Sequence, residues 1–245
     1  LINECKKMAI DVKAPDLNIS FEDFRPIDNK SISYGLNAIK NVGAKALETI
    51  IVERKENGPY ETIFDLCSRV DQQKVNKRVL ESLIMSGSLD SIQGSRAEQF
   101  LSVDDAIKYG QQMQSETNRN QVDLFGSKSD QSDLIKVPVL QSAQDWSEKE
   151  ALKKEAEVLG LYVSGHPLLE HSDDLEEFTT ISFEEGDQIS KNDNITLGGM
   201  ITRIVKRFDR RNRQMAFFEM DCLGGHAEIV TFSDCFATYG HLIEE

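Results

Sequence analysis

The spacing of hydrophobic residues changes along this chain from a helical repeat to a strand repeat, which limits the folds open to it. Between about residues 31 and 110 the apolar residues recur three or four positions apart, as in Leu36, Ile39, Leu47, Ile50 and Ile51. In the last third, Met215 to Cys222 alternates, which predicts a strand with Ala216, Phe218, Met220 and Cys222 on one face. Helices followed by strands predict an α+β chain with more than one domain.

Start and stop signals divide the chain into short elements. Gly58-Pro59 and Gly87 end predicted helices, and N-terminal caps are expected at Thr62 with Asp65, Asn76, Ser95 with Glu98, and Ser147 with Glu150. The Ser95 helix is expected to continue through Ile107. Strands are expected over Ile195–Ile204, Met215–Cys222 and His226–Phe232, with a helix opening at Ser233-Asp234. Three meandering strands and a helix are typical of the first part of an OB-type barrel, so we expect a partial β-barrel with an open edge.

These signals predict five regions. Residues 1–28 are expected to form a short helix, Leu1–Met8, and an extended segment that has no core of its own and packs on a missing neighbour. Residues 29–110 form a helical domain, and residues 111–145, which are polar and rich in Gln, Ser and Asp, form a flexible linker. Residues 146–189 are a connecting helical segment, and residues 190–245 are the N-terminal part of an OB-fold domain. Since the chain starts at Leu1 and stops at Glu245 within a predicted helix, we expect a fragment of a longer polypeptide.

Charge is distributed unevenly over the 245 residues. The net charge of -14 argues against a protein that binds nucleic acid over its whole surface. Residues 116–187 contain 17 acidic and 6 basic residues, whereas residues 191–213 contain 7 basic and 2 acidic residues. An acidic connector therefore precedes a basic hairpin, and such local patches decide which partners can approach.

Composition also limits the possible sites and the location. The four cysteines, Cys5, Cys67, Cys222 and Cys235, have no CxxC spacing and are expected to be reduced thiols, and no metal site is predicted. No apolar run is long enough to cross a bilayer and no signal peptide opens the sequence, so we expect a cytoplasmic protein.

The segment Ile39–Leu47 (IKNVGAKAL) has the pattern of two helices joined by a tight hairpin. The hairpin requires positive φ, which Asn41 and Gly43 can supply at its corners. Free N–H groups at the start of the second helix predict a site for a DNA phosphate oxygen, formed by Lys40, Asn41, Val42, Gly43, Ala44 and Lys45. The common form of this hairpin has Gly where Asn41 stands and Ala where Leu47 stands, and the alternative is an ordinary turn in a helical bundle.

A second hairpin is expected at Leu83–Ile92 (LIMSGSLDSI). It is less well formed than the first. It is either the partner of the first hairpin in a tandem pair or an element that only packs.

The basic segment Ile204–Arg213 joins two of the predicted barrel strands. OB barrels hold single strands by combining positive charge with stacked aromatic rings. If Phe218 faces inward, alternation places Phe217 outward, where it can stack on a base. The predicted single-strand site comprises Arg203, Lys206, Arg207, Arg210, Arg211, Arg213 and Phe217. The alternative is a solubilising loop with both phenylalanines buried.

The polar region contains one apolar pair, in the pentapeptide Gln121, Val122, Asp123, Leu124 and Phe125. A Gln side chain can donate and accept hydrogen bonds at the rim of a pocket, and a Leu-Phe pair can fill an apolar pocket. The pentapeptide looks like the motif with which bacterial proteins bind the sliding clamp. The alternative is that Leu124 and Phe125 fold back onto the helical domain.

No catalytic constellation is present, since HExxH, GxSxG, P-loop and GxGxxG motifs are all absent from the sequence. The paired carboxylates Asp104-Asp105 and Asp173-Asp174 are expected to be solvated, and His166 before Pro167 is expected in a turn. We therefore predict no catalytic residue and no cofactor.

Four runs of sequence, together with the order of the parts, carry a resemblance to a known family. They are YGLNAIKNVG (34–43), VNKRVLESLIMSGSLDS (75–91), EVLGLYVSGHPL (157–168) and QVDLF (121–125). The chain resembles the C-terminal half of the alpha subunits of bacterial DNA polymerase III, which are C-family replicative polymerases. The resemblance covers essentially the whole chain.

The resemblance implies a role for each region. Residues 1–28 would be the tail of the fingers region. Residues 29–110 would be the clamp-binding domain, whose tandem helix–hairpin–helix motifs touch duplex DNA behind the active site. Residues 121–125 would bind the beta sliding clamp, and the OB part would lie near the single-stranded template. The parent enzyme is a DNA-directed DNA polymerase that uses carboxylate-held Mg²⁺, with its catalytic aspartates upstream. The chain alone would then be inactive.

Two other interpretations stay open from the sequence. One is a non-catalytic protein-interaction hub that contacts other polymerase III holoenzyme subunits without touching DNA. The other is the same region of an error-prone polymerase of this type.

Overall fold

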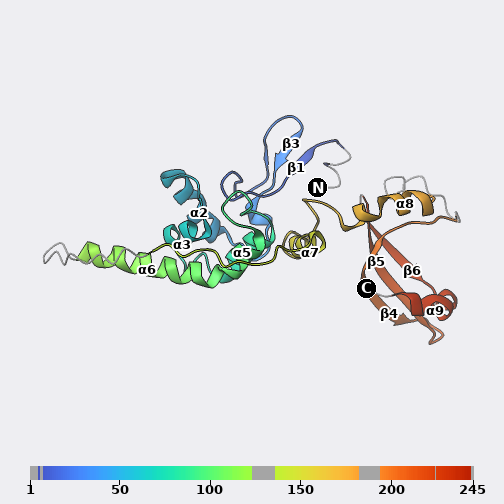
Figure 1. Ribbon diagram of the computed structural model, residues 1–245. Helices are drawn as coiled ribbons and strands as arrows, with labels where there is room; N and C mark the ends of the chain where they lie inside the picture. The colour runs from blue at the N-terminus through green and yellow to red at the C-terminus, as the bar shows by residue number, and fades with distance from the viewer. Residues whose placement is uncertain (1–4, 6–7, 123–135, 182–193, 224, 244–245) are drawn as a thin grey trace. The chain divides into compact units, whose positions relative to one another are not determined.

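The computed structural model describes every residue except 1–4, 6–7, 123–135, 182–193, 224 and 244–245 (Figure 1). It confirms an α+β chain and divides it into two compact units, residues 2–164 and residues 165–245. The first unit is mainly helical, and the second contains an antiparallel sheet. Within the described ranges, no helix has the length and apolar character that would let it cross a membrane.

The helical unit includes a small sheet from the start of the chain. Strand β1 (Asp11–Lys13) pairs in parallel with β3 (Ser31–Ser33), and β2 (Arg25–Pro26) pairs antiparallel with β3. Leu17 is fully buried in the helical core, and its N–H donates to the Ser88 carbonyl at 2.8 Å. This corrects the expectation that residues 1–28 pack on a missing neighbour, because long-range contacts hold them to their own unit. The helix expected over Leu1–Met8 falls mostly outside the described residues.

The helices that follow are η1 (Leu36–Ala38), α2 (Ala44–Asn57), α3 (Ile63–Arg69), α4 (Lys77–Met85), α5 (Arg96–Leu101) and α6 (Val103–Val122). Helices α3, α4 and α5 begin at the predicted caps. Thr62 and Asn76 accept hydrogen bonds from N–H groups three residues on, and Ser95 forms a capping box with Glu98. The helix expected from Ser95 through Ile107 is two helices, since α5 ends before Ser102.

Helix α6 extends into the segment expected to be a flexible linker. It continues to Val122, whereas the linker was expected from residue 111. The polar side chains bind neighbouring backbone: Gln114 Nε2 donates to the Val70 carbonyl at 2.7 Å, and Gln72 Nε2 donates to the Ile107 carbonyl at 3.0 Å. At Gly110 an added Cβ would lie 2.2 Å from the Cys67 carbonyl oxygen, so glycine allows α3 and α6 to approach closely.

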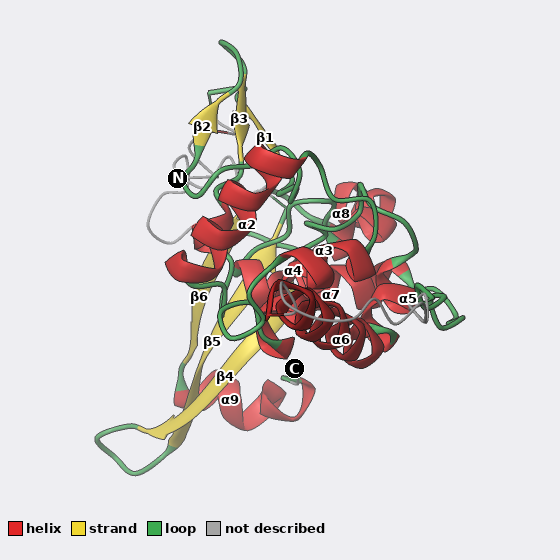
Figure 2. Ribbon diagram, turned by 90° about the vertical axis from the view of Figure 1, so that its left-hand side faces the viewer, coloured by secondary structure: helices red, strands yellow, loops and turns green. Residues whose placement is uncertain are grey.

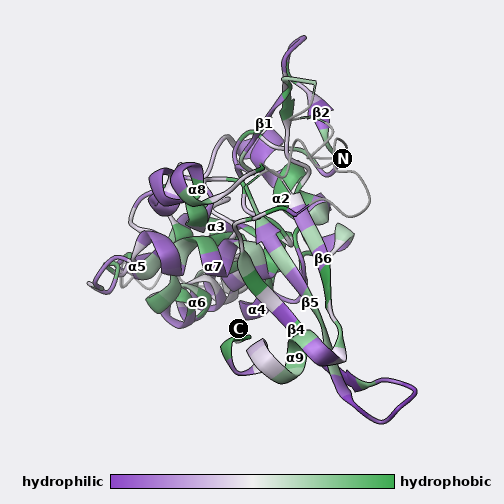
Figure 3. Cartoon of the chain, turned by 90° about the vertical axis from the view of Figure 1, so that its right-hand side faces the viewer, coloured by the Kyte–Doolittle hydropathy of each residue, from purple (hydrophilic) through white to green (hydrophobic). Residues whose placement is uncertain are grey.

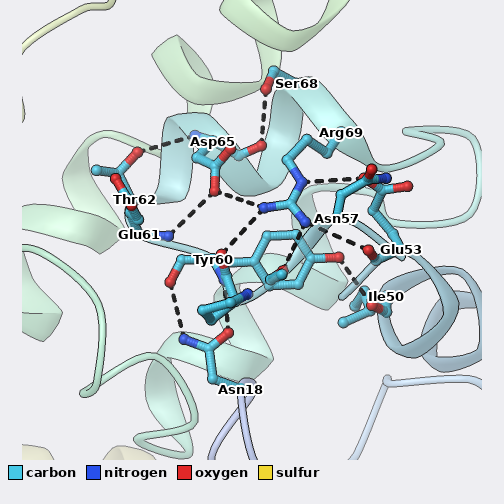
Figure 4. Close-up of polar contacts among 12 residues, drawn as sticks. Asn18, Ile50, Glu53, Asn57, Tyr60, Glu61, Thr62, Asp65, Ser68 and Arg69 are labelled. Atoms are coloured by element: carbon cyan, nitrogen blue, oxygen red, sulfur yellow. Dashed lines mark hydrogen bonds and ion pairs between the residues drawn. The ribbon is translucent and has the colours of Figure 1, made fainter. Parts of the chain in front are cut away.

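Arg69 at the end of α3 joins three segments of the helical unit (Figure 4). Its guanidinium pairs with Glu53 at 3.1 Å and Asp65 at 3.0 Å, and donates to the Gly58 carbonyl at 2.8 Å. It also lies over the Tyr60 ring, 4.4 Å from the centroid. These contacts fix α2 against α3, and thereby the helix that carries the first hairpin.

Residues 136–159 also belong to the helical unit. The Gln141 N–H donates to Ser102 Oγ at 2.8 Å, and the Trp146 ring packs edge-on against Phe100 with centroids 5.6 Å apart. Helix α7 (Glu148–Leu159) begins at the predicted cap, Ser147, and its last turn is buried in the core. The linker expected over residues 111–145 is therefore attached to the helical unit both before and after residues 123–135.

The buried carboxylate of Glu155 fixes the end of this unit. It is 1% exposed and accepts hydrogen bonds from the N–H groups of Val163 at 2.6 Å and Ser164 at 2.9 Å. The Ser164 hydroxyl also donates to it, and Arg96 Nη1 lies 3.5 Å away. The boundary therefore falls after Ser164, inside the segment 146–189 that was expected to be one connector.

The second unit consists of η2 (Pro167–His171), α8 (Ser172–Phe178), strands β4 (Met200–Phe208), β5 (Gln214–Cys222) and β6 (Gly225–Thr231), α9 (Ser233–Tyr239) and η4 (Gly240–Leu242) (Figure 2). The strands form an antiparallel meander in the order β4-β5-β6. This open sheet followed by a helix is consistent with part of an OB barrel. The first strand starts at Met200 rather than at the expected Ile195.

The alternation predicted for β5 is confirmed. Ala216, Met220 and Cys222 are buried, whereas Phe217 on the other face is 39% exposed. Phe236 of α9 is also buried in this unit, and Lys206 Nζ lies 5.9 Å from the centroid of its ring. The sheet therefore has a covered inner face and an open outer face.

Candidate nucleic-acid interface

The first hairpin is a tight turn that leads into α2. Asn41 has a φ of +68°, and the Val42 N–H donates to the Ile39 carbonyl at 3.2 Å. The expectation of a positive φ at Gly43 is wrong. Its φ of -88° and ψ of 156° correspond to an extended backbone. Gly43 is the N-cap of α2 and, having no side chain, offers no cap to the first N–H groups of that helix.

Gly43 is not required by the fold itself. Its backbone conformation suits any residue, and an added Cβ would meet nothing within 4 Å. The open space in front of the helix start leaves room for a ligand to approach the backbone. No sequence signal separates this glycine from one needed for a turn.

Contacts on its inner side hold the hairpin in place. The Lys40 N–H donates to the Val158 carbonyl at 2.9 Å, and Asn41 Nδ2 donates to Ser82 Oγ of α4 at 3.1 Å. Val42 is buried, whereas the side chains of Lys40 and Lys45 are exposed. Of the six residues predicted to contact DNA, Val42 is therefore buried and the other five are exposed at the turn and the first residues of α2.

The element before the hairpin is shorter than predicted. Only the 3-10 helix η1 precedes it, because the N–H groups of Leu36 and Asn37 donate to the Phe21 and Glu22 carbonyls. Gly35 permits this approach, since an added Cβ would lie 2.6 Å from the backbone N of Phe24. Residues 11–33 contain β1 to β3, and we call them the N-terminal lobe. This lobe therefore replaces the first helix of the pair.

The second hairpin is packed inside the helical unit. Gly87, with a φ of +77°, and Ser88 donate to the Ile84 and Leu83 carbonyls at 3.0 Å each, which is a Schellman motif. Ser88 is fully buried, and an added Cβ at Gly87 would lie 2.2 Å from Arg96 Nη2. Of the two interpretations of this segment, the geometry favours packing.

The basic residues of the β4–β5 hairpin divide into three groups. Arg203 and Arg207 lie with Phe217 on the outer face of the sheet, around a shallow apolar hollow that also includes Val205 and Val230. Lys206 points to the opposite face. The connection between the strands is hydrophilic and carries the exposed Arg210 and Arg211 (Figure 3).

Arg213 has a structural role in this hairpin. Its Nε pairs with Asp209 at 3.0 Å and its Nη1 pairs with Asp234 of α9. Asp209 also accepts the N–H groups of Arg211 and Arg213 at 2.8 Å and the Ser233 hydroxyl at 2.7 Å. The predicted single-strand site is therefore brought together only in part, on the outer face and at the tip.

The predicted clamp peptide begins at the end of α6. Gln121 and Val122 are the last two residues of α6, while Asp123, Leu124 and Phe125 lie outside the described residues.

The paired carboxylates of the sequence are in contact with basic side chains. Asp104 pairs with Lys77 at 2.8 Å, and His171 lies 3.8 Å from Asp174. Across the described part of the chain, no cluster of three or more His, Cys, Asp or Glu side chains is arranged to hold a metal ion.

Comparison with known proteins first defines a class. A family model described as a helix–hairpin–helix motif matches residues 9–99, which include the lobe, both hairpins and α2 to α4. Residues 9–99 therefore match a helix–hairpin–helix motif.

Relatives then give a more particular assignment. The chain is 33% identical over its whole length to DNA polymerase III subunit alpha of Vibrio cholerae, 34% to that of Borreliella burgdorferi and 32% to that of Escherichia coli K12. In each comparison the chain spans 21% of the length of the relative. It is thus homologous along its whole length to one region of DNA polymerase III alpha subunits.

Proposed function

We propose that this chain is the DNA-contacting and sliding-clamp-binding part of a replicative DNA polymerase alpha subunit, and that it supports processive DNA-directed DNA synthesis. The exposed turn at Asn41–Gly43, which leads into an uncapped helix N-terminus within a helix–hairpin–helix match, carries this proposal. The catalytic carboxylates and their Mg²⁺ would lie in other regions of the polymerase.

Duplex DNA would meet the first hairpin through its backbone. The N–H groups at the start of α2 can donate to one phosphate oxygen, and the helix dipole favours the negative charge there. Lys40 and Lys45 on either side add positive charge. Because no base edge is needed, binding would be independent of sequence, as a replicating enzyme requires.

The other two surfaces would act beside this contact. Residues Gln121 to Phe125 would bind the beta sliding clamp, which tethers the enzyme and raises the local concentration of the primer end. Arg203, Arg207 and Phe217 would hold the single-stranded template, with phosphate contacts and base stacking. Further contacts with other polymerase III holoenzyme subunits fit the same role.

A serine at position 43 tests the duplex contact. Gly43→Ser places a hydroxyl that can cap α2, so the free energy of unfolding should be unchanged or higher by roughly a few tenths of a kcal/mol. The same side chain fills the space in front of the N–H groups, so affinity for random-sequence duplex should fall several-fold in fluorescence anisotropy. The wild-type affinity should fall steeply as salt rises. An unchanged affinity in the variant, or binding that ignores salt, would refute the contact.

Truncation of the apolar pair tests the clamp contact. Leu124 and Phe125 each contribute about 1.5–3 kcal/mol if fully buried, so changing both to Ala should weaken binding to the purified clamp at least about 100-fold. Val137 and Val139, which are exposed on the same connector, provide the matched double-alanine control. Equal effects of the two double variants in a titration would remove the peptide from the proposal.

A further inference from the structure

Helix α4 lies directly against the first hairpin. Asn41 Nδ2, at the corner of the hairpin, donates to Ser82 Oγ on α4 at 3.1 Å. Ser82 is buried, so this contact holds the hairpin to one face of α4. Side chains on the same face of α4 therefore lie along the helix from the Asn41 corner of the hairpin.

Arg78 lies on that face, one turn before Ser82. Residues four apart on a helix are neighbours on its surface, and four residues rise about 6 Å along the axis. Arg78 is exposed, and no carboxylate among the described residues forms an ion pair with it. Lys77, beside it in the sequence, is instead paired with Asp104 at 2.8 Å.

This spacing suits a nucleic-acid backbone. Successive phosphates of one strand are about 3.4 Å apart along the axis of a duplex, so a cation displaced by about 6 Å reaches a phosphate one or two nucleotides away. The guanidinium fork of Arg also binds a phosphate through two parallel hydrogen bonds.

We infer that Arg78 extends the phosphate-binding surface of the first hairpin and contacts a second phosphate of the same strand. This inference rests on the proposed duplex contact at Gly43. The sequence gives no signal for it, because Arg78 is joined to the hairpin only through the contact between Asn41 and Ser82. With the exposed Lys40 and Lys45, it would make a third cation available to the same stretch of DNA backbone.

The test compares two neighbouring cations on α4 in the full chain. Arg78→Ala should lower the affinity for a random-sequence duplex about 5–10-fold at low salt, and should reduce the slope of log affinity against log salt by about 0.9. Lys77→Ala should leave the slope unchanged, since its charge is already paired with Asp104. Both variants should keep the wild-type circular dichroism spectrum and differ little in Tm.

The outcomes separate the inference from the function on which it rests. If Gly43→Ser weakens duplex binding but Arg78→Ala does not alter the slope, the inference is overturned and the duplex contact stands. If Arg78→Ala and Lys77→Ala reduce the slope equally, a general charge effect replaces the specific contact and the inference is again overturned. If neither Gly43→Ser nor Arg78→Ala weakens duplex binding, both the proposed duplex contact and the inference about Arg78 fail.

Discussion

Arg69 shows how one side chain can hold several backbone segments at once. Its planar fork donates to two carboxylates and a carbonyl from different directions, and its flat face covers Tyr60. Burial raises the pKa of the Tyr60 hydroxyl, which donates to the Ile50 carbonyl at 2.9 Å and stays protonated. The C-terminal part of α2 is thereby joined to the start of α3.

Replacing Arg69 by lysine keeps the charge but removes the fork. A lysine ammonium cannot reach Glu53, Asp65 and the Gly58 carbonyl together, so we expect a loss of about 2–3 kcal/mol in the free energy of unfolding. Urea denaturation measures this loss. Arg25→Lys is the control, since Arg25 is exposed and lies over the Phe21 ring, and it should cost less than about 1 kcal/mol. Equal losses would mean that the fork contributes nothing.

Among the elements, the β4–β5 hairpin is held by one carboxylate at its base. Asp209 accepts hydrogen bonds from the backbone of Arg213 and Arg211, from the Ser233 hydroxyl and from the Arg213 side chain, and these lower its pKa to about 2, with the Arg213 N–H the largest cause. A carboxyl whose pKa is lowered on folding stabilises the fold above its ordinary pKa near 4. That contribution is lost as the pH falls towards 2.

The hairpin should therefore keep its form at mildly acidic pH. We expect the Asp209 carboxyl carbon to titrate near pH 2 in an NMR experiment, well below the ordinary aspartate pKa near 4. Ser233→Ala removes one hydrogen bond and should move the midpoint upward. A midpoint near 4 in the unaltered chain would show that these hydrogen bonds do not favour the ionised carboxylate.

How far the sequence predicts each element depends on whether its causes are local. The caps at Thr62, Asn76 and Ser95 are confirmed, because the signal and the bond it predicts lie within three residues. The extent of α6 is not predictable in this way, since its polar residues bind backbone groups far away in the chain. Arg213 pairs locally with Asp209, but its second partner, Asp234, is brought to it by α9 and is not predictable from the hairpin alone.

In the candidate site, too, the features with local causes are predictable from the sequence and those with long-range causes are not. Positive φ at Asn41 is predictable from the residue type and is confirmed. The ordinary backbone angles of Gly43 have no local sequence signal, and the packing of Asn41 against α4 depends on a contact between residues 41 positions apart. Local pattern therefore locates the hairpin, while packing decides which side chains surround it.

At the scale of the whole molecule, the proposed partners require separate surfaces on a chain with a net charge of -14. An acidic molecule repels nucleic acid at long range, so the local basic groups have to act at short range. The first hairpin lies in the helical unit and the outer face of the sheet in the other unit. Linking such modest sites on one chain raises the overall affinity without any new contact.

The Glu155 carboxylate sets a practical limit on dividing this chain. A shortened version that stopped at Gly160 would keep Glu155 inside the protein but remove the hydrogen-bond donors of Val163 and Ser164, leaving the buried carboxylate with Arg96 at 3.5 Å. A version that stops at Ser164 retains them. We therefore expect that another domain can be fused between Ser164 and Gly165 without lowering the stability of the helical unit.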